Sequence, residues 1–184
     1  KGSLTIDTDE QPGKAKLERI PELRPAFAKD GTVTAANSSS ISDGAAALVL
    51  TSATKAAALG LTTRARIIGH STFAQEPGWF TTAPVTAVRT LMDRVRWTLD
   101  DVDLFEVNEA FAVVAMAAMH DLEIPHEKLN IRGGACALGH PVGASGARIL
   151  VTLIHALEDL GLKRGIASLC IGGGEATAVA VEID

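Results

Sequence analysis

The sequence holds few of the residues that build disulfide frameworks or metal sites. Only two cysteines occur in 184 residues, Cys136 and Cys170, and they form no CxxC pair. A disulfide framework and a structural zinc site are therefore not expected, and a reducing cytoplasm fits this cysteine content. Cys136 and His140 could share one face of a helix and hold a metal, but Gly139 and Pro141 oppose a helix there. We therefore expect no metal.

Long apolar runs and basic clusters are also missing. No apolar stretch is continuous enough to cross a bilayer, which argues against a membrane partner. The formal net charge of −5 and the lack of any basic run argue against a nucleic-acid partner. With 47% hydrophobic residues the chain can still bury a sizeable core, in one or two domains. Because the first residue is Lys1 and not methionine, we expect a processed, truncated or partial chain.

The apolar pattern predicts an α/β chain from residue 41 onward, after an irregular stretch over residues 1–40. Strands are predicted at 45–50, 65–69, 102–107, 166–171 and 176–183, and helices at 52–59, 84–95, 109–120 and 145–160. Residues 70–83 are predicted to form a loop. The helix over 109–120 is apolar nearly all round, so we expect it to be buried and central.

One histidine lies in a glycine-rich stretch. Five glycines fall within residues 130–148, and His140 stands there between Gly139 and Pro141. Proline biases the residue before it towards an extended backbone, so the imidazole is held at a turn. Histidine is the side chain best suited to exchanging a proton near neutral pH. The alternative is a tight strand-to-helix connection without chemistry.

Two further candidates stand at the ends of predicted strands. Asn108 follows the strand over 102–107, at a strand-to-helix junction where α/β folds bind ligands, although it could simply cap the helix. Cys170 precedes the turn Gly172–Gly174, whose amides could face a substrate, although most such cysteines are inert core residues. With His140, these residues form a Cys/His site with amide donors, which suits acyl transfer or carbanion chemistry beside a carbonyl.

Three segments resemble the signature blocks of the thiolases, which are acetyl-CoA acetyltransferases and 3-ketoacyl-CoA thiolases. The segments are Asn108-Glu109-Ala110-Phe111, Gly133 to Gly146 and Cys170 to Gly174, and their order and spacing also match. The resemblance covers essentially the whole chain. It implies a thiolase-like layered α/β fold, a mixed sheet covered by helices. It also implies three parts: residues 1–40 as the end of the loop domain that binds coenzyme A, 41–62 as the last strand and helix of the N-terminal core domain, and 63–184 as the C-terminal core domain.

The resemblance also implies a role for each site residue. His140 would be the base for a nucleophilic cysteine, and would share an oxyanion hole with a water held by Asn108. Cys170 would exchange the proton at the α-carbon of the second acyl-CoA, and the Gly172 amide would help to form a second oxyanion hole. Phe80 would border the acyl pocket. Positions that match contacts with coenzyme A in relatives are Phe27, Ala35, Ser39, Ala110 and Phe111.

The implied activity is that of an acyl-CoA acyltransferase: Claisen condensation of two acetyl-CoA, or thiolysis of a 3-ketoacyl-CoA. The coenzyme A thioester is the substrate and no cofactor is needed. The family carries its acyl-accepting cysteine in an N-terminal half that this sequence lacks, and Cys136, at a variable position, is not expected to replace it. We therefore expect the chain alone to be inactive, with that half as a partner and a homodimer or homotetramer as the complete enzyme. The alternative is a non-catalytic, acyl-CoA-binding or structural half that docks with a separate N-terminal half.

Overall fold

The computed structural model describes residues 3 and 5–183, so the predicted domain ends at residues 1 and 184 lie outside the described residues. The chain divides into two compact units, residues 1–36 and residues 37–184. In the first unit, the described elements are the short helix α1 (Glu10–Lys14) and the 3₁₀ helix Leu17–Glu22. The Asp9 carboxylate accepts a hydrogen bond from the Gln11 amide and so caps α1. The mainly irregular character predicted for this stretch is confirmed.

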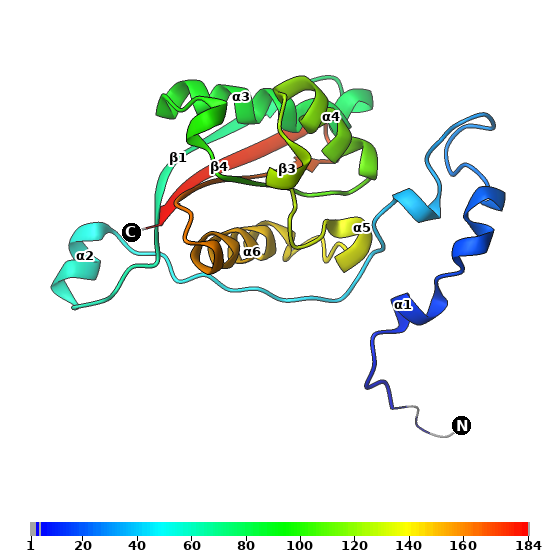
Figure 1. Ribbon diagram of the computed structural model, residues 1–184, viewed down its shortest axis with the longest axis horizontal. Coiled ribbons are helices and arrows are strands. Elements are labelled where there is room, and N and C mark those ends of the chain that lie inside the picture. Colours follow the sequence, from blue (N-terminus) through cyan, green and yellow to red (C-terminus); the bar gives the residue numbers. More distant parts are fainter. Residues whose placement is uncertain (1–2, 4, 184) are drawn as a thin grey trace. The chain divides into compact units, whose positions relative to one another are not determined.

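The second unit is built on a four-stranded mixed sheet in the order β1-β4-β3-β2 (Figure 1). Its strands are β1 (Ala65–Ala74), β2 (Leu104–Val107), β3 (Arg164–Ile171) and β4 (Glu175–Ile183). β1 and β3 both pair antiparallel with β4, whereas β2 pairs parallel with β3. Parallel pairing brings the carboxyl ends of β2 and β3 to the same edge of the sheet. This edge is where Asn108 and Cys170 emerge.

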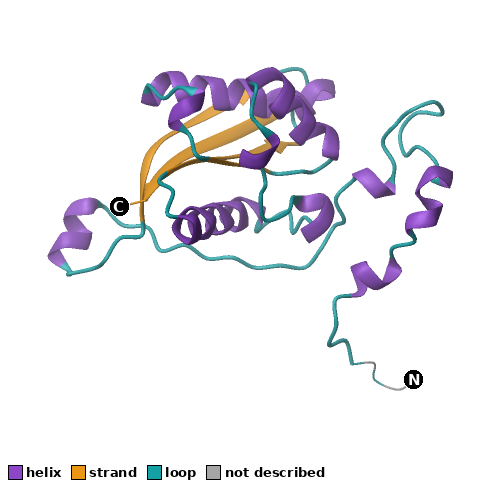
Figure 2. Ribbon diagram, in the orientation of Figure 1, coloured by secondary structure: helices purple, strands orange, loops and turns teal. Residues whose placement is uncertain are grey.

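Helices cover both faces of the sheet (Figure 2). On one face lie α3 (Ala83–Val95) and α4 (Ala112–Leu122), and on the other lies α6 (Ser145–Leu160). The shorter elements of this unit are α2 (Ala53–Ala58), α5 (Ala135–Leu138) and 3₁₀ turns at Pro77–Thr82, Leu99–Asp101 and His126–Lys128, while a further turn, Ala35–Asn37, spans the boundary between the units. None of the helices in the described residues has the length and apolarity needed to cross a membrane.

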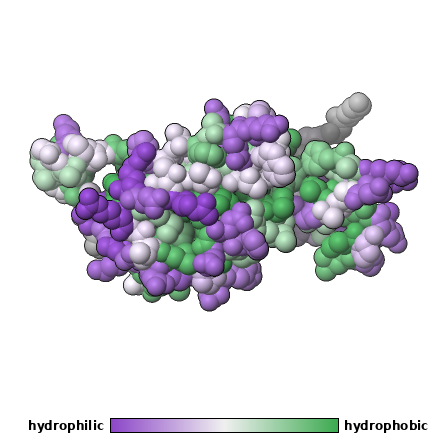
Figure 3. Space-filling view, turned by 90° about the horizontal axis from the view of Figure 1, so that it is seen from above, coloured by the Kyte–Doolittle hydropathy of each residue, from purple (hydrophilic) through white to green (hydrophobic). Residues whose placement is uncertain are grey.

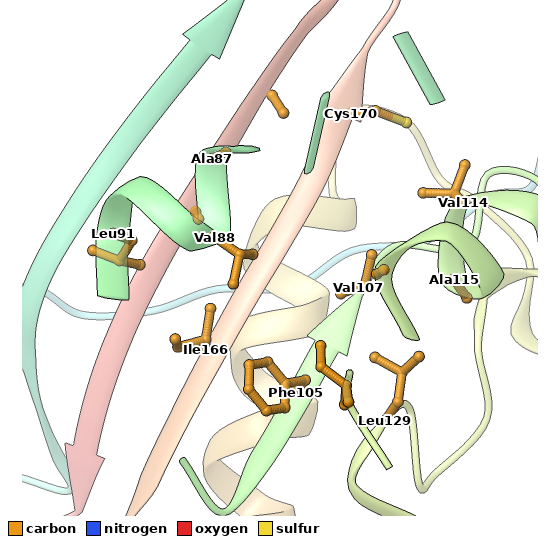
Figure 4. Packing of buried hydrophobic residues seen from close by; sticks show 14 of the residues in the cluster. Ala87, Val88, Leu91, Phe105, Val107, Val114, Ala115, Leu129, Ile166 and Cys170 are labelled. Atoms are coloured by element: carbon orange, nitrogen blue, oxygen red, sulfur yellow. The ribbon is translucent and has the colours of Figure 1, made fainter. Parts of the chain in front are cut away.

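Each layer has its own hydrophobic core. The helix predicted over 84–95 is confirmed as α3, in which Val88 and Leu91 are fully buried in one cluster with Phe105 of β2 and Ile166 of β3 (Figure 4). On the other face, the apolar stripe of α6 is buried against Leu104 and Ala167. Each fully buried side chain of this size contributes about 1.5–3 kcal/mol of apolar transfer free energy. The two cores therefore fix β2 and β3, the strands that lead to the site, from both sides.

Three predictions about secondary structure are wrong. Residues 45–50 form no strand, and Val49 is 94% exposed. A strand exists only by pairing, and no described strand pairs with this stretch. Residues 70–83 do not form a simple loop, because β1 continues to Ala74 and a 3₁₀ turn follows it.

The helix predicted for 109–120 is α4, and it begins three residues later, after Phe111. It is not buried all round either, since Met116 is 58% exposed and Val113 is exposed as well. Apolar residues also reach the surface elsewhere, as the green areas of Figure 3 show. An apolar helix face left open to water is expected where a further layer of protein would cover it.

Candidate active site

The backbone around His140 is held by the segment that runs beside it. The His140 amide donates a hydrogen bond to the Ser40 carbonyl at 2.9 Å, and Ile41 pairs with His140 as an isolated parallel bridge. Gly139, just before, has a φ of +86°, and a Cβ at this residue would collide with the Ser42 hydroxyl. Only glycine fits this position without strain. The loop therefore presents the imidazole at a turn, as predicted.

Ser145 fixes the protonation pattern of the His140 ring. The Ser145 Oγ lies 2.6 Å from His140 Nδ1 and 3.1 Å from the carbonyl oxygen of Pro141. A carbonyl can only accept, so the hydroxyl hydrogen points at Pro141 and Nδ1–H of His140 donates to Oγ. In the neutral ring, Nε2 therefore carries the free lone pair. Burial, and secondly the positive charge of Arg148, lower the pKa of His140, so at neutral pH the imidazole is an uncharged base.

Asn108 meets His140 on its Nε2 side. The side-chain Nδ2 of Asn108 lies 3.5 Å from His140 Nε2. The backbone N–H of Asn108 donates to the Ser168 carbonyl at 2.9 Å across the parallel strands. The residue is only 1% exposed, and its Oδ1 has no hydrogen-bond partner among the described residues. The N-cap interpretation is wrong, because Phe111 holds the N-cap position of α4. An oriented, buried amide with an unused oxygen could hold a small polar ligand or a water.

Cys170 is buried at the carboxyl end of β3. It belongs to the core under α3 and α4, with Val107 and Val114 in the same cluster (Figure 4). In the described part of the chain it makes no hydrogen bond to His140 or Asn108. Burial raises the pKa of the Cys170 thiol, which favours the protonated form. The structure thus places this thiol at the same sheet edge as Asn108, and no hydrogen bond joins the two among the described residues.

The turn after Cys170 exposes a backbone donor. The Gly172 N–H has no acceptor among the described residues, and a Cβ at Gly172 would meet open space. The turn closes through Gly174, whose amide donates to Ile171 and whose carbonyl accepts from Gln75 at 3.0 Å. Gly174 has a φ of +91°, and a Cβ there would strike the Gln75 carbonyl. Gly172 therefore leaves its N–H free to bind a ligand, and Gly174 allows the tight turn.

The residues predicted to contact coenzyme A fall into two groups. Ser39 donates from both its amide and its hydroxyl to the Ala110 carbonyl, at 3.0 and 2.9 Å. Phe111, next in the chain, pairs with Ser38 as an isolated bridge, so this group is contiguous. Phe27 and Ala35 belong to the separate unit of residues 1–36, and Phe27 is exposed there. The shared role of the two groups stays a prediction.

Phe80 lies against the start of α4. Its ring meets the Phe111 ring edge to face, with centroids 6.3 Å apart and the planes at 67°. Gln75 fixes the turn that carries Phe80, since its Nε2 donates to Thr82 Oγ1 at 2.8 Å and also to the Trp79 carbonyl. Phe80 is therefore a half-buried ring in a fixed place beside a predicted coenzyme A contact.

The second cysteine has a structural environment. The Cys136 amide donates to the Glu109 carboxylate at 3.1 Å, and its thiol contacts the Glu109 carbonyl at 3.6 Å. Burial, and then the charge and hydrogen bonding of Glu109, raise the pKa of the Cys136 thiol to about 12. A thiol with that pKa holds its proton at neutral pH and is a poor nucleophile. This agrees with the expectation that Cys136 does not replace the missing nucleophile.

Sequence reasoning missed three polar residues of this region: Ser145, Glu106 and Arg148. Ser145 was taken only as the start of a helix. Glu106 is the one charged residue within the buried strand β2, and its side chain lies 3.6 Å from Arg148 of α6. The signal was available, because a carboxylate in an apolar strand two residues before Asn108 faces the same side of the sheet as Asn108.

Two hollows flank the site without including its central residues. One, of about 440 Å³, lies between residues 42–46 and the loop 141–147, and the other, of about 350 Å³, lies between α4 and residues 126–134. Neither is lined by His140 or Cys170. Neither hollow therefore contains the side chains of the candidate site.

Comparison with known proteins decides the family. A profile described as "Thiolase, C-terminal domain" matches residues 61–183, and one described as "Thiolase, N-terminal domain" matches residues 1–54. The chain belongs to the thiolase family. Among curated thiolases, it is 50% identical over 182 residues to acetyl-CoA acetyltransferase 2 of Arabidopsis thaliana, covering 98% of this chain and 45% of that protein. It is 49% identical over 182 residues to a probable acetyl-CoA acetyltransferase of Dictyostelium discoideum, covering 98% of this chain and 44% of that protein.

Solved thiolase structures confirm the layered fold. The acetyl-CoA acetyltransferase of Bacillus anthracis superposes with a TM-score of 0.89 at 46% identity, covering 93% of this chain and 43% of that one. Human mitochondrial 3-ketoacyl-CoA thiolase in complex with CoA superposes with a TM-score of 0.86 at 38% identity, covering 98% of this chain and 46% of that one. The chain therefore spans a little under half the length of the thiolases it matches.

Proposed function

We propose that this chain is the proton-transferring half of a thiolase that acts on acetyl-CoA. The reaction is the Claisen condensation of two acetyl-CoA, or in reverse the thiolysis of a 3-ketoacyl-CoA. The observation that carries the proposal is the chain of contacts Ser145–His140–Asn108, because it leaves a neutral Nε2 free to accept a proton. The acyl-accepting cysteine would come from the N-terminal half of the thiolase.

In the first half-reaction, His140 Nε2 takes the proton of that cysteine, and the thiolate attacks the thioester carbonyl of the first acetyl-CoA. The bond from the carbonyl carbon to the coenzyme A sulfur breaks, and His140 returns the proton to the departing thiolate. Amide donors beside the carbonyl stabilise the oxyanion, and a water held by Asn108 Oδ1 is suited to this task. The Oδ1 would then gain the partner it lacks.

In the second half-reaction, Cys170 acts as its thiolate, which the raised pKa makes a stronger base, and takes a proton from the α-carbon of the second acetyl-CoA. The carbanion attacks the acyl-enzyme, a carbon–carbon bond forms, and the bond from the acyl carbon to the enzyme cysteine breaks. The enzyme cysteine leaves as a thiolate, and the proton that Cys170 took from carbon passes through His140 to that thiolate, so Cys170 becomes a thiolate again. Thiolysis runs these steps backwards, with Cys170 returning the proton to carbon. The raised pKa of the buried Cys170 thiol suits this return, since the thiol keeps its proton until the carbanion forms. The Gly172 N–H, which has no acceptor among the described residues, would hold the oxyanion of this step.

The further attributes of this thiolase are extensions of the same proposal. Coenzyme A would contact Phe27, Ala35, Ser39, Ala110 and Phe111. No dissociable cofactor takes part. The domain division at residues 40 and 62, a homodimeric or homotetrameric assembly and a cytoplasmic location rest on the family resemblance and on the cysteine content, and they stay predictions.

Co-expression with the N-terminal half of a related acetyl-CoA acetyltransferase tests the proposal. The assembly should cleave acetoacetyl-CoA in the presence of coenzyme A, and His140→Gln should abolish the cleavage. His155→Gln is the matched control, because His155 lies exposed on α6 and pairs with Glu158 and Arg64. An assembly that forms and binds acetyl-CoA without turnover would support the alternative, a non-catalytic acyl-CoA-binding half.

A further inference from the structure

Glu106 is a buried carboxylate that the proposed reaction does not use. It is 2% exposed, and it lies in β2 between Phe105 and Val107, both of which are core residues. Strand alternation turns its side chain to the α6 face, the same side as Asn108 two residues later. Its ionic partner is Arg148, whose Nη1 lies 3.6 Å from its Oε2.

Arg148 stands on α6 one turn after Ser145. Its Nη1 also donates to Thr152 Oγ1 at 3.4 Å, and its Nε has no partner among the described residues. Ser145 in turn holds His140 Nδ1. The Glu106–Arg148 pair therefore joins the strand that carries Asn108 to the helix whose first turn orients His140.

Stability does not explain this pair. Burial raises the pKa of Glu106 to about 7, although the charge of Arg148 lowers it. The desolvation of the carboxylate therefore costs more free energy than its attraction to Arg148 contributes. Apolar residues of similar volume would fill the same space at lower cost. A charged pair does something that apolar residues cannot, because its two groups must face each other. It thereby fixes how β2 and α6 lie against each other at the site.

We propose that the Glu106–Arg148 pair is a positioning element that sets the separation between Asn108 and His140. Its effect on turnover rests on the proposed function, whereas its effect on geometry does not. Glu106 in β2 stands two residues before Asn108, and Arg148 stands three residues after Ser145 in α6. The pair therefore acts on the site through these short backbone segments. A shift of one element against the other moves the amide away from the imidazole.

The decisive variant replaces both charges with apolar side chains, Glu106→Leu together with Arg148→Met. Asp159→Asn is the matched control, because it breaks an exposed ion pair with Arg132 at the far end of the same helix. Three quantities are measured for each variant: the thermal midpoint of the chain, the Asn108 Nδ2 to His140 Nε2 distance in crystal structures, and kcat and KM of the assembly with an N-terminal half.

The double variant should unfold at or above the midpoint of the parent, since no charge is left buried without a partner. Its kcat should fall by about 10²-fold with little change in KM for acetyl-CoA, the loss expected for a misplacement of about 1 Å. The Asn108–His140 distance should lengthen. Asp159→Asn should match the parent in all three quantities. A double variant with the parent's kcat and distance would overturn the proposal.

Two outcomes separate this proposal from the proposed function. If the parent assembly shows no turnover, the proposed function fails, and the crystallographic distance alone decides whether the pair positions the site. If the double variant does not fold, Glu106→Gln, which keeps the shape of the side chain, takes its place. An unchanged distance in Glu106→Gln would then overturn the proposal. Arg148→Lys, which keeps the charge, should retain more of the parent's kcat than Arg148→Met.

Discussion

In the proposed reaction, His140 and Cys170 handle different protons. His140 offers Nε2 because Ser145 holds its other nitrogen, whereas Cys170 sits in the core and keeps a high thiol pKa. The two residues should therefore fail at different steps when they are replaced. His140→Ala should stop acylation of the partner half's cysteine by acetyl-CoA. Cys170→Ala should still let that cysteine be acylated.

Rapid quenching and mass spectrometry of the assembled enzyme measure this difference. In Cys170→Ala, the acyl-enzyme should accumulate, carbon–carbon bond formation should fall by about 10²–10⁴-fold, and exchange of the α-protons of acetyl-CoA with solvent should stop. Asn108→Ala should be milder, because Asn108 positions a group and moves no proton itself. Equal loss of acylation in His140→Ala and Cys170→Ala would mean that both act in one step.

Phe80 limits the room beside the start of α4. Its ring packs edge to face on Phe111, so Phe80→Ala should open space there and extend acceptance to longer 3-ketoacyl-CoA substrates. The rate against chain length in the assembled enzyme measures this. Trp79→Ala is the control, because Trp79 is the exposed neighbour on the same turn. An unchanged chain-length profile in Phe80→Ala would refute the idea.

Cys136 should be inert as long as Glu109 is charged. With a thiol pKa of about 12, it should resist iodoacetamide at pH 8 in a chain where Cys170 is replaced by alanine. Glu109→Gln removes a negative charge and a hydrogen bond that raise this pKa, so labelling should speed up. Equal labelling rates with and without the Glu109 charge would show that burial alone controls the thiol.

At the scale of the element, β2 contributes a pH dependence to stability through Glu106. Its pKa of about 7 in the folded chain lies above the ordinary value of 4.5, so the folded state holds the proton more tightly. This contribution is fully present below pH 4.5 and is lost as the pH rises through about 7, a change on the order of 3 kcal/mol. Glu106→Gln removes the titration.

Urea unfolding of the parent and of Glu106→Gln at several pH values measures this contribution. The free energy of unfolding of the variant should exceed that of the parent by a margin that grows between about pH 5 and pH 8. Glu175→Gln, at an exposed carboxylate, serves as the control and should show no such trend. A margin that does not change with pH would mean that Glu106 is ionised throughout.

The elements that sequence predicted well are those whose partners lie in the chain. The apolar stripe of α6 packs on strands of the same chain, and Gly161 ends the helix. The structure confirms this helix over Ser145–Leu160. Residues 45–50 have the composition of a strand, but pairing is a property of two segments and the second is not among the described residues. The late start of α4 has another cause, since Asn108 turns its amide to His140 instead of capping the helix.

The same distinction holds for the site. Glycine spacing pointed to His140, and strand ends pointed to Asn108 and Cys170, because these signals are local in sequence. The contacts of Ser145 and the Glu106–Arg148 pair were not visible, since they depend on which face of α6 meets β2. Alternation along β2 shows only that Glu106 and Asn108 share a side. The packing of α6 on β2 then brings the Arg148 guanidinium next to the Glu106 carboxylate.

At the scale of the whole molecule, one apolar segment has no pairing partner among the described residues. Val49 and Leu50 are 94% and 72% exposed, and the amides of residues 45–50 have no acceptor among the described residues. The whole segment lies within the match to the thiolase N-terminal domain, which covers residues 1–54. We expect these residues to complete a sheet of the separate N-terminal half.

Hydrogen exchange with and without that half tests this expectation. In the chain alone, residues 45–50 should exchange as fast as an unstructured peptide, and the exposed apolar surface, including Met116, should make the chain self-associate and dissolve poorly. Assembly with the N-terminal half should slow this exchange by orders of magnitude and suppress self-association in sedimentation. Residues 166–168 of β3 are the control, because they pair with both β2 and β4 within the chain and should be protected in both samples. Strong protection of 45–50 in the monomeric chain alone would show that the segment needs no partner, and the N-terminal half would then have to dock elsewhere.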